Sequence, residues 1–333
     1  MKYAKLDLHL HLDGSLNLQW AWKTAVKRGV VAPDCTFEEY YNRMHQTEFP
    51  NREERMKRFD FPIAIMQTRE DLSASIYHLI ATLAEKELYY AEIRFAPQQH
   101  MLEGLTQHEV VEAVLEGRAQ ALKEFPDIEI GVINCLMHKG ADAHANWDAN
   151  VETIRVTKEF LGKGVVALDL AGYENNGDFN LYAPLFEMAR ELEIPYTIHA
   201  GEMGDGSHVP MAIGMGAYRI GHGFNCTQKP EWLAEVVEKQ IPLEVCLTGN
   251  VLSAFDGFYA AHPIRQMIDA GVKITLNTDN MTFAKTDLDN EYAQLRALGV
   301  SMEHLEQFAK NSIDAAFCSE ETKEKLRKKM GFI

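Results

Sequence analysis

Two histidines lie one residue apart in the apolar stretch LDLHLHLDGS, residues 6–15. Residues i and i+2 of a β-strand point to the same side, so a strand here places His9 and His11 on one face and the neighbouring leucines on the other. Buried imidazoles each need a polar partner, and one metal ion can serve both. A solvated pair on a strand edge fits the stretch equally well, so the rest of the chain must decide.

Other polar residues close apolar runs much later in the chain. IHAGE contains His199 and Glu202, IGHG contains His222, and LNTDN contains Asp279 and Asn280. A lone histidine at a strand end is most often a hydrogen-bonded residue without a special role. Barrels of parallel strands, however, carry their chemistry at the carboxyl ends of the strands. Four strand ends would bring such residues to the same end of a barrel, and this convergence favours a catalytic site.

Four residues of this set have the composition of a zinc site that leaves room for water: His9, His11, His199 and Asp279. Bound zinc lowers the pKa of its water from about 15.7 to roughly 7, so hydroxide is available at neutral pH. Glu202 and His222 then remain for acid catalysis and for positioning the nucleophile. We expect one metal, because the fourth apolar run, VVALDL, lacks the modified lysine that bridges two ions in binuclear barrel hydrolases.

The elements that position these residues follow from eight short apolar runs. They span residues 6–10, 89–95, 128–136, 164–170, 194–200, 217–222, 241–247 and 271–277. Helix-like stretches such as 105–125 and 180–193 lie between them, and this alternation indicates a parallel sheet covered by helices. Eight runs favour an α/β fold of the closed (β/α)₈ TIM-barrel type. A doubly wound open sheet is the alternative, although no G-x-G-x-x-G follows the first run.

The interval between the first two runs is far longer than the intervals between later ones. We expect residues 15–88 to hold additional helices that lie over the barrel mouth as a lid. Most aromatic side chains of this segment are expected to pack between helices, and a few to line a substrate pocket.

Composition limits the class of protein. The chain has 333 residues, 46% of them hydrophobic, and no linker-like shift in composition, so we expect a single barrel domain over 1–333. Its net charge of −16 argues against binding nucleic acid or anionic membranes through a broad basic surface. Five scattered cysteines without C-x-x-C, and no leader-like or membrane-spanning run, favour a reduced cytoplasmic protein. The oligomeric state is left open.

Taken together, the motifs resemble those of the adenosine deaminase family of metal-dependent amidohydrolases. The matching stretches run nearly from end to end: LHLHLDGS, EIRFAPQ, VVALDLAG, HAGE, RIGHG, EVC followed by TGN, HPI, and LNTDN. The resemblance implies a (β/α)₈ barrel with one catalytic Zn²⁺ per chain. It also implies a small-molecule purine nucleoside as substrate, with adenosine or 2′-deoxyadenosine deaminated hydrolytically in purine salvage.

The resemblance implies a role for each matching residue at the reaction centre. The implied zinc ligands are His9, His11, His199 and Asp279. Glu202 would protonate purine N1 and so make C6 more electrophilic. Asp279 would act as the base towards the attacking water, and His222 would hold the attacking oxygen.

Substrate contacts are implied in the same way. Gly172 corresponds to the position whose backbone meets purine N3, and Asp13 with His11 to the ribose contact. A plain turn glycine and a loop-capping aspartate explain Gly172 and Asp13 without any ligand. Asn280 stands where many members have a second aspartate that contacts N7, and an amide can keep this contact without charge. A carboxylate at Asp13 suits a ribose hydroxyl and disfavours AMP.

Other functions fit parts of this pattern. The stretch CLTGN, residues 246–250, replaces a common proline and serine near the site, so adenine, an N6-substituted purine or a 5′-modified adenosine are alternative substrates. A non-catalytic purine-binding barrel would be expected to lack the complete acid, base and ligand set. A metal-dependent hydrolase of amides or phosphoesters would have no evident use for Glu202, an acid aimed at a ring nitrogen.

Overall fold

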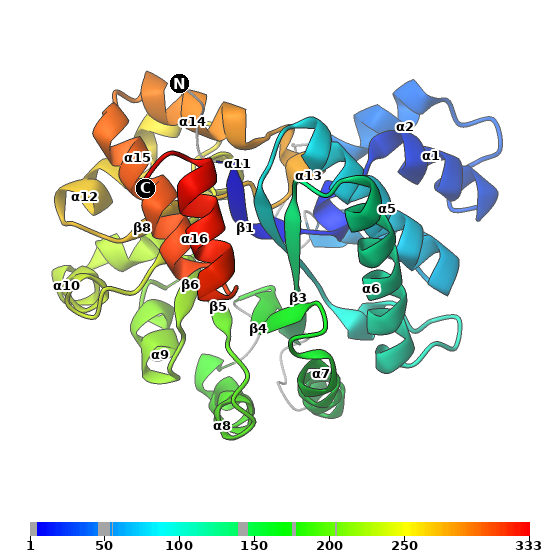
Figure 1. Cartoon of the computed structure of the whole chain (residues 1–333), viewed down its shortest axis with the longest axis horizontal. Coiled ribbons are helices and arrows are strands. Elements are labelled where there is room, and N and C mark those ends of the chain that lie inside the picture. The colour runs from blue at the N-terminus through cyan, green and yellow to red at the C-terminus, as the bar shows by residue number, and fades with distance from the viewer. Residues whose placement is uncertain (1–4, 46–53, 55, 139–145, 175–177, 204) are drawn as a thin grey trace.

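The computed structural model describes residues 5–45, 54, 56–138, 146–174, 178–203 and 205–333. Helices surround a set of parallel strands at the centre of the molecule (Figure 1). The strands are β1 (Leu6–His11), β2 (Tyr90–Phe95), β3 (Glu129–His138), β4 (Val165–Gly172), β5 (Thr197–Ala200), β6 (Arg219–His222), β7 (Leu243–Val245) and β8 (Ile274–Leu276). Each overlaps one of the eight apolar runs, which confirms their predicted positions.

The strands follow one another around a barrel. They form two parallel sheets, β1–β2–β3–β4 and β5–β6–β7–β8. Single parallel bridges join the sheets, from Leu168 to Tyr196 at one junction and from Leu10 to Asp279 at the other. At the second junction, two backbone hydrogen bonds of 2.8 Å tie the Asp279 peptide group to β1. This sequential order confirms the predicted (β/α)₈ barrel, and the doubly wound alternative is wrong.

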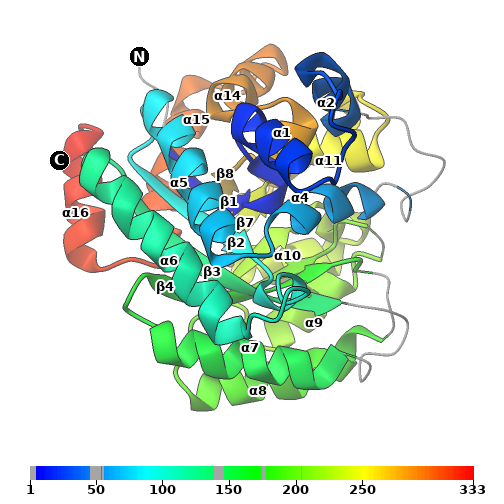
Figure 2. The same cartoon turned by 90° about the vertical axis from the view of Figure 1, so that its right-hand side faces the viewer.

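Helices α1 (Leu18–Lys27), α2 (Phe37–Met44) and α4 (Asp60–Ile65) lie between β1 and β2 in the chain, before α5 (Arg69–Glu85). Figure 2 shows α5 running beside α6 (Gln107–Glu124), so α5 belongs to the outer layer of the barrel. The additional helices predicted for this segment are therefore α1, α2 and α4. Residues 46–53 and 55 of the predicted lid lie outside the described residues, and its motion stays a prediction.

Side-chain caps explain where several helices begin. Thr68 accepts a hydrogen bond from the Asp71 N–H at the start of α5, and Thr106 with Glu109 forms a capping box at the start of α6. Such caps typically contribute about 1 kcal/mol each. The remaining helices are α7 (Trp147–Phe160), α8 (Ala183–Glu191), α9 (His208–Gly214), α10 (Pro230–Glu238), α11 (Leu247–Ala254), α12 (Ile264–Asp269), α13 (Met281–Ala284), α14 (Leu288–Ala297), α15 (Met302–Ala315) and α16 (Glu320–Lys329).

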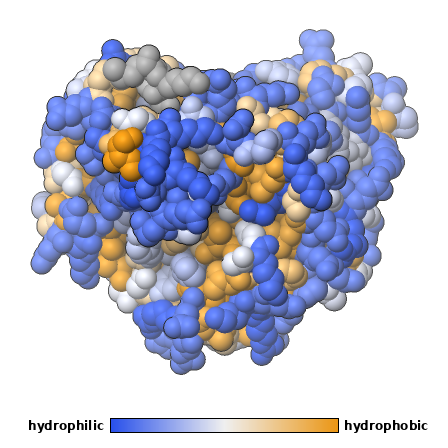
Figure 3. Space-filling view, in the orientation of Figure 1, coloured by the Kyte–Doolittle hydropathy of each residue, from blue (hydrophilic) through white to orange (hydrophobic). Residues whose placement is uncertain are grey.

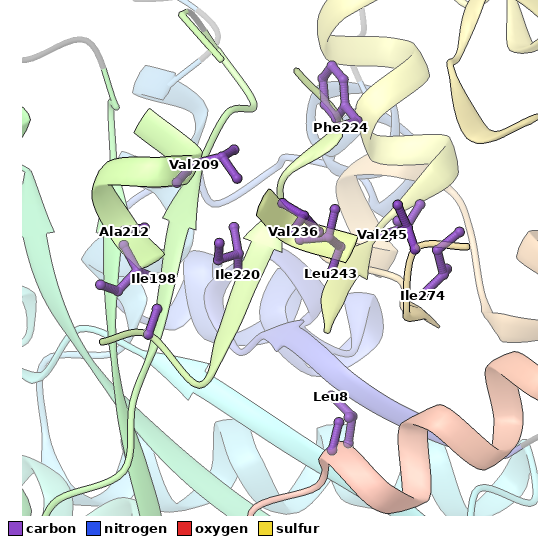
Figure 4. Close-up of a cluster of buried hydrophobic side chains, with 14 of the residues drawn as sticks. Leu8, Ile198, Val209, Ala212, Ile220, Phe224, Val236, Leu243, Val245 and Ile274 are labelled. Atoms are coloured by element: carbon purple, nitrogen blue, oxygen red, sulfur yellow. The ribbon is translucent and has the colours of Figure 1, made fainter. Parts of the chain in front are cut away.

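Strand alternation builds the core and directs the polar residues. Figure 4 shows Ile198 of β5 close to Val209 and Ala212 of α9, and all three side chains are buried. Removing a large aliphatic side chain from water stabilises a fold by roughly 1.5–3 kcal/mol. Because Ile198 points outward to the helix, the next residue, His199, points into the barrel. Packing of the outer layer thus fixes the direction of the inner polar side chains.

Polar and charged residues cover most of the face shown in Figure 3, with apolar residues in smaller groups between them. This agrees with the excess of acidic residues in the sequence. Among the described residues, no helix is both long enough and apolar enough to cross a bilayer.

Buried His100, which follows β2, is expected to make the fold less stable in acid. Its Nδ1 donates to the Met66 carbonyl over 3.0 Å, and burial lowers the pKa of the ring to about 4. An unfolded histidine has a pKa near 6.5, so the unfolded chain binds more protons between these values and stability falls as pH drops from about 6.5 to 4. His100→Gln keeps a donor for Met66 and should flatten this slope by up to about 1.4 kcal/mol per pH unit.

Urea unfolding of both proteins at several pH values measures this difference. His304→Gln is the matched control, because His304 is exposed on α15 and its replacement should leave the slope unchanged. Equal pH slopes for wild type and His100→Gln would contradict the assignment of acid sensitivity to His100.

Candidate active site

The carboxyl ends of the strands bring the side chains predicted as metal ligands to one place. His9 and His11 lie on β1, His199 lies on β5 and Asp279 follows β8. The Nε2 atoms of His11 and His199 are 3.3 Å apart. Asp279 Oδ1 lies 3.4 Å from His11 Nε2 and 3.7 Å from His9 Nε2. All four side chains therefore share one small volume.

The donor atoms in this volume fit a divalent cation. His9 Nε2 is buried and has no hydrogen-bond partner within the described part of the chain. Ligand atoms of His9, His11 and Asp279 lie within 4.8 Å of one another, as do those of His9, His199 and His222. Imidazole nitrogens with a carboxylate oxygen are a donor set for zinc and similar ions. The arrangement thus indicates a divalent metal site, where an ion would give the buried nitrogen its partner.

Two buried carboxylates orient the imidazoles from the opposite side of the rings. His9 Nδ1 donates to Glu244 Oε2 over 2.7 Å, and His199 Nδ1 donates to Asp169 Oδ2 over 2.9 Å. Arg94 joins the carboxylates, at 2.8 Å from Asp169 and 2.9 Å from Glu244. Each Nε2 then keeps its lone pair, as is common in metal-bound histidines. Sequence analysis missed these three residues, although a charged residue within an apolar strand was a signal for each.

Electrostatics keep the imidazoles of β1 neutral. Burial lowers the pKa of His9 and His11 well below the usual value, and Arg94 and His199 lower it further. Burial by itself would raise the pKa of Asp169, but His199 and Arg94 bring it down to about 2. Neutral imidazole is the form that binds a metal ion, and an ionised carboxylate behind the ring makes it a stronger ligand.

Glu202 and His222 lie near the same volume. Glu202 follows β5 and His222 ends β6, with 3.7 Å between Glu202 Oε2 and His222 Nε2. The second ring nitrogen, Nδ1, lies 2.8 Å from the Asn250 side-chain amide on α11. Burial lowers the pKa of His222 to about 4. Asn250 therefore fixes the orientation of a neutral ring, a role that sequence analysis did not assign to the CLTGN stretch.

Two adjoining cavities provide space for a ligand. The smaller one, about 80 Å³, is lined by residues that include His199, Glu202, His222, Asp279 and Asn280. The larger one, about 640 Å³, is lined by residues that include Asp13, Ile63, Phe95, Met137 and His138. His11, Phe59 and Gly172 line both cavities. The site therefore has the candidate metal ligands with Glu202 and His222 at one end and a wider space at the other.

Gly172 and Asp13 border these cavities. Gly172 ends β4 with a φ of 103°, which favours glycine, and a Cβ there would lie 2.7 Å from the His138 carbonyl oxygen. The fold therefore requires a glycine at this position, and the absence of a side chain also leaves the Gly172 backbone accessible from the cavities. Asp13 is buried in the turn after β1, and burial raises the pKa of its carboxyl group to about 7.

Comparison with known proteins identifies the family. The family model described as adenosine deaminase matches residues 4–331. The chain belongs to the adenosine deaminase family. An adenosine deaminase from Haemophilus ducreyi is 38% identical over 331 residues, which cover 98% of this chain and 95% of that protein. The protein is therefore a hydrolase that deaminates a purine, as its motifs predicted.

Solved structures agree with the fold. Adenine deaminase from Arthrobacter aurescens has a TM-score of 0.86 and 23% identity, with 98% of each chain covered. An amidohydrolase from Burkholderia ambifaria, solved with bound zinc, has a TM-score of 0.85 and 22% identity, with 98% of this chain and 89% of that chain covered. Because both sequence identities are low, this structural similarity establishes that the proteins share the barrel fold.

Two glycines in stretches that match the adenosine deaminase family leave room for polar side chains at the end of β8. Asn280 Oδ1 is buried without a hydrogen-bond partner among the described residues, and a Cβ at Gly14 would lie only 1.6 Å from that oxygen. A Cβ at Gly249 would lie 3.0 Å from Asp279 Oδ2. Glycine at 14 and 249 thus leaves room for both side chains at the end of β8.

Proposed function

We propose that the protein catalyses the zinc-dependent hydrolysis of adenosine and 2′-deoxyadenosine to inosine or 2′-deoxyinosine and ammonia. The observation that carries this proposal is the cavity of about 80 Å³ lined by Glu202, His222 and Asp279 together with His11 and His199. A proton donor and a metal-ligand cluster border the same small space. Hydrolysis at C6 needs this combination, because the ring must be protonated while water attacks it.

The proposed ligands of one zinc ion per chain are His9, His11, His199 and Asp279. The buried, unpartnered Nε2 of His9 and the carboxylates behind His9 and His199 support this assignment. The zinc-bound amidohydrolase of the same fold supports the choice of metal. Zinc in such a site makes a water molecule acidic enough to act as a nucleophile near neutral pH.

The side chains of the protein move the protons. Glu202 donates a proton to purine N1, Asp279 accepts one from the attacking water, and His222 holds the attacking oxygen through Nε2. The C6–O bond forms, the C6–N6 bond breaks, and N6 leaves as ammonia with the proton carried by Asp279. The second water proton restores Glu202, so adenosine and water give inosine and ammonia.

Three groups are proposed to recognise the substrate around the reacting carbon. The backbone of Gly172 meets N3, the amide of Asn280 meets N7, and Asp13 with His11 contacts a ribose hydroxyl. The bare backbone at Gly172 supports the first contact, and the position of Asn280 in the lining of the smaller cavity supports the second, in which its NH₂ group would donate to N7. The adjoining cavity of about 640 Å³ favours a nucleoside over free adenine, because it leaves room for a sugar. We place this activity in cytoplasmic purine salvage, carried out by one barrel domain over 1–333.

Steady-state rates on a substrate panel test the proposed function. Adenosine and 2′-deoxyadenosine are expected to have the highest kcat/KM, followed by uncharged 5′-modified adenosines, with adenine and AMP much lower. Ultraviolet absorbance follows the ring change, and a coupled assay follows ammonia. A higher kcat/KM for adenine or AMP would contradict the proposed substrate. Full zinc occupancy without ammonia from any 6-aminopurine would instead favour the non-catalytic alternative.

A further inference from the structure

We propose that Glu174 is a positioning residue that holds the backbone of the acid Glu202 and so determines where its carboxyl group lies. The inference rests on the proposed function, because it concerns the proton donor of that reaction. Glu174 follows β4, and the segment that it contacts, Gly201–Met203, follows β5.

The Glu174 carboxylate accepts hydrogen bonds from three successive backbone N–H groups. Oε1 lies 2.5 Å from the Gly201 nitrogen, and Oε2 lies 2.9 Å from the Glu202 nitrogen and 2.8 Å from the Met203 nitrogen. Oε1 also accepts from His208 Nδ1 over 2.8 Å. Backbone donors that leave a strand need partners when they are buried, and here one side chain supplies them all.

The geometry of the Gly201–Met203 segment makes the hydrogen bonds from Glu174 important for the position of the Glu202 backbone. Gly201 has a φ of 70°, so the chain turns sharply directly before the acid. On the other side, Asn225 Nδ2 donates to the Glu202 carbonyl oxygen over 3.2 Å. Side chains from outside the segment therefore hold both polar groups of the Glu202 backbone. The position of its Cα is set by Glu174 and Asn225 more than by strand pairing.

The charge of Glu174 suits this role. Its side chain is buried, and burial alone would raise its pKa, yet His208 and the N–H groups lower the pKa to about 2. His208 is held in turn by Phe179, whose ring stacks on it at 4.6 Å with 7° between the planes. A carboxylate can accept all four hydrogen bonds, whereas the amide of glutamine has one acceptor oxygen and would direct an NH₂ group at some of the same donors.

Glu174 acts through Glu202 and does not reach the substrate in this arrangement. It is absent from the residues that line either cavity. Its substitution should therefore change the transfer of the proton more than the binding of the ring. A misplacement of about 1 Å at a reacting group can cost about 100-fold in rate.

The test compares Glu174→Gln with wild type and with Asp71→Asn. Asp71 is a buried carboxylate paired with Arg28 at 2.6 Å, and it lines neither cavity. Glu174→Gln is expected to lower kcat for adenosine about 100-fold with little change in KM or zinc content. Asp71→Asn should lose thermal stability and keep kcat. Unchanged kcat in folded Glu174→Gln, or an equal loss in Asp71→Asn, would overturn the positioning role.

A second readout isolates the N1 contact. Purine riboside and its 1-deaza analogue differ only in the ring nitrogen that Glu202 meets, so the ratio of their inhibition constants reports the position of the acid. Glu174→Gln should bring this ratio towards one. General loosening of the fold would instead weaken the binding of both ligands alike and leave the ratio unchanged. An unchanged ratio would therefore contradict the inference.

A milder variant keeps the inference testable if Glu174→Gln does not fold. His208→Asn removes the imidazole that donates to Oε1 and stacks on Phe179, but it leaves the three backbone donors in place. It should lower kcat less, in the same direction, with the same shift in the inhibitor ratio. Unchanged kcat and ratio in this variant would overturn the inference. Wild-type protein is assayed first. Absence of ammonia from wild type contradicts the proposed function, whereas active wild type with unimpaired variants contradicts only the role of Glu174.

Discussion

Glu202→Gln is expected to lower the rate of adenosine deamination by about 10²- to 10⁴-fold while the protein keeps its metal and its affinity for purine nucleosides. Glutamine matches glutamate in size, and its NH₂ group can still donate a hydrogen bond to N1, but it has no carboxyl proton to transfer. The backbone bonds from Glu174 do not involve the Glu202 side chain, so the segment should keep its position. Steady-state kinetics by ultraviolet absorbance give kcat, and equilibrium binding of purine riboside gives the affinity.

Two measurements separate this result from damage to the fold. Glu303→Gln, an exposed acid on α15, is the matched control and should behave as wild type. Elemental analysis of both variants should give the zinc content of the wild type. A kcat for Glu202→Gln within a few-fold of wild type would refute the role of proton donor, and loss of zinc would assign Glu202 to the metal site.

His9→Ala is expected to lose the metal and, with it, deamination. His9 belongs to both groups of candidate ligands, and its side chain is completely buried against Glu244. Changes to residues behind a metal ligand typically cost 10–100-fold in metal affinity, so removal of the ligand itself should exceed about 100-fold. Elemental analysis after dialysis against buffer without metal measures the remaining zinc.

An exposed histidine supplies the control for this variant. His304→Ala should keep full zinc and full activity, because His304 lies on the outer surface of α15. Circular dichroism of His9→Ala should show that the barrel is retained. Full zinc occupancy of folded His9→Ala would contradict its assignment as a ligand and would leave His11, His199, His222 and Asp279 as the remaining donors.

The sequence by itself predicted the architecture and the polar residues that the strand ends bring together. Strand alternation is a local property, so LDLHLH predicted that His9 and His11 share a face, and the apolar runs marked all eight strands. Polar residues at strand ends then pointed to one mouth, because parallel strands of a barrel present their carboxyl ends together. For this reason His199, Glu202, His222 and Asp279 were found without coordinates.

Only the tertiary structure decided how these residues are held. His11 and His199 lie 188 positions apart, and the pairing of His9 with Glu244 and of His199 with Asp169 depends on the stagger of strands around the barrel. Sequence spacing carries no information on that stagger, because it results from closure of the whole barrel. The contact of Asn250 with His222 depends in the same way on where helix α11 meets the end of β6. The same holds for the bonds from Glu174 to the segment that bears Glu202. Hence the side chains proposed to react could be predicted from local pattern. The groups that orient them appeared only once long-range packing had brought separate strand ends together.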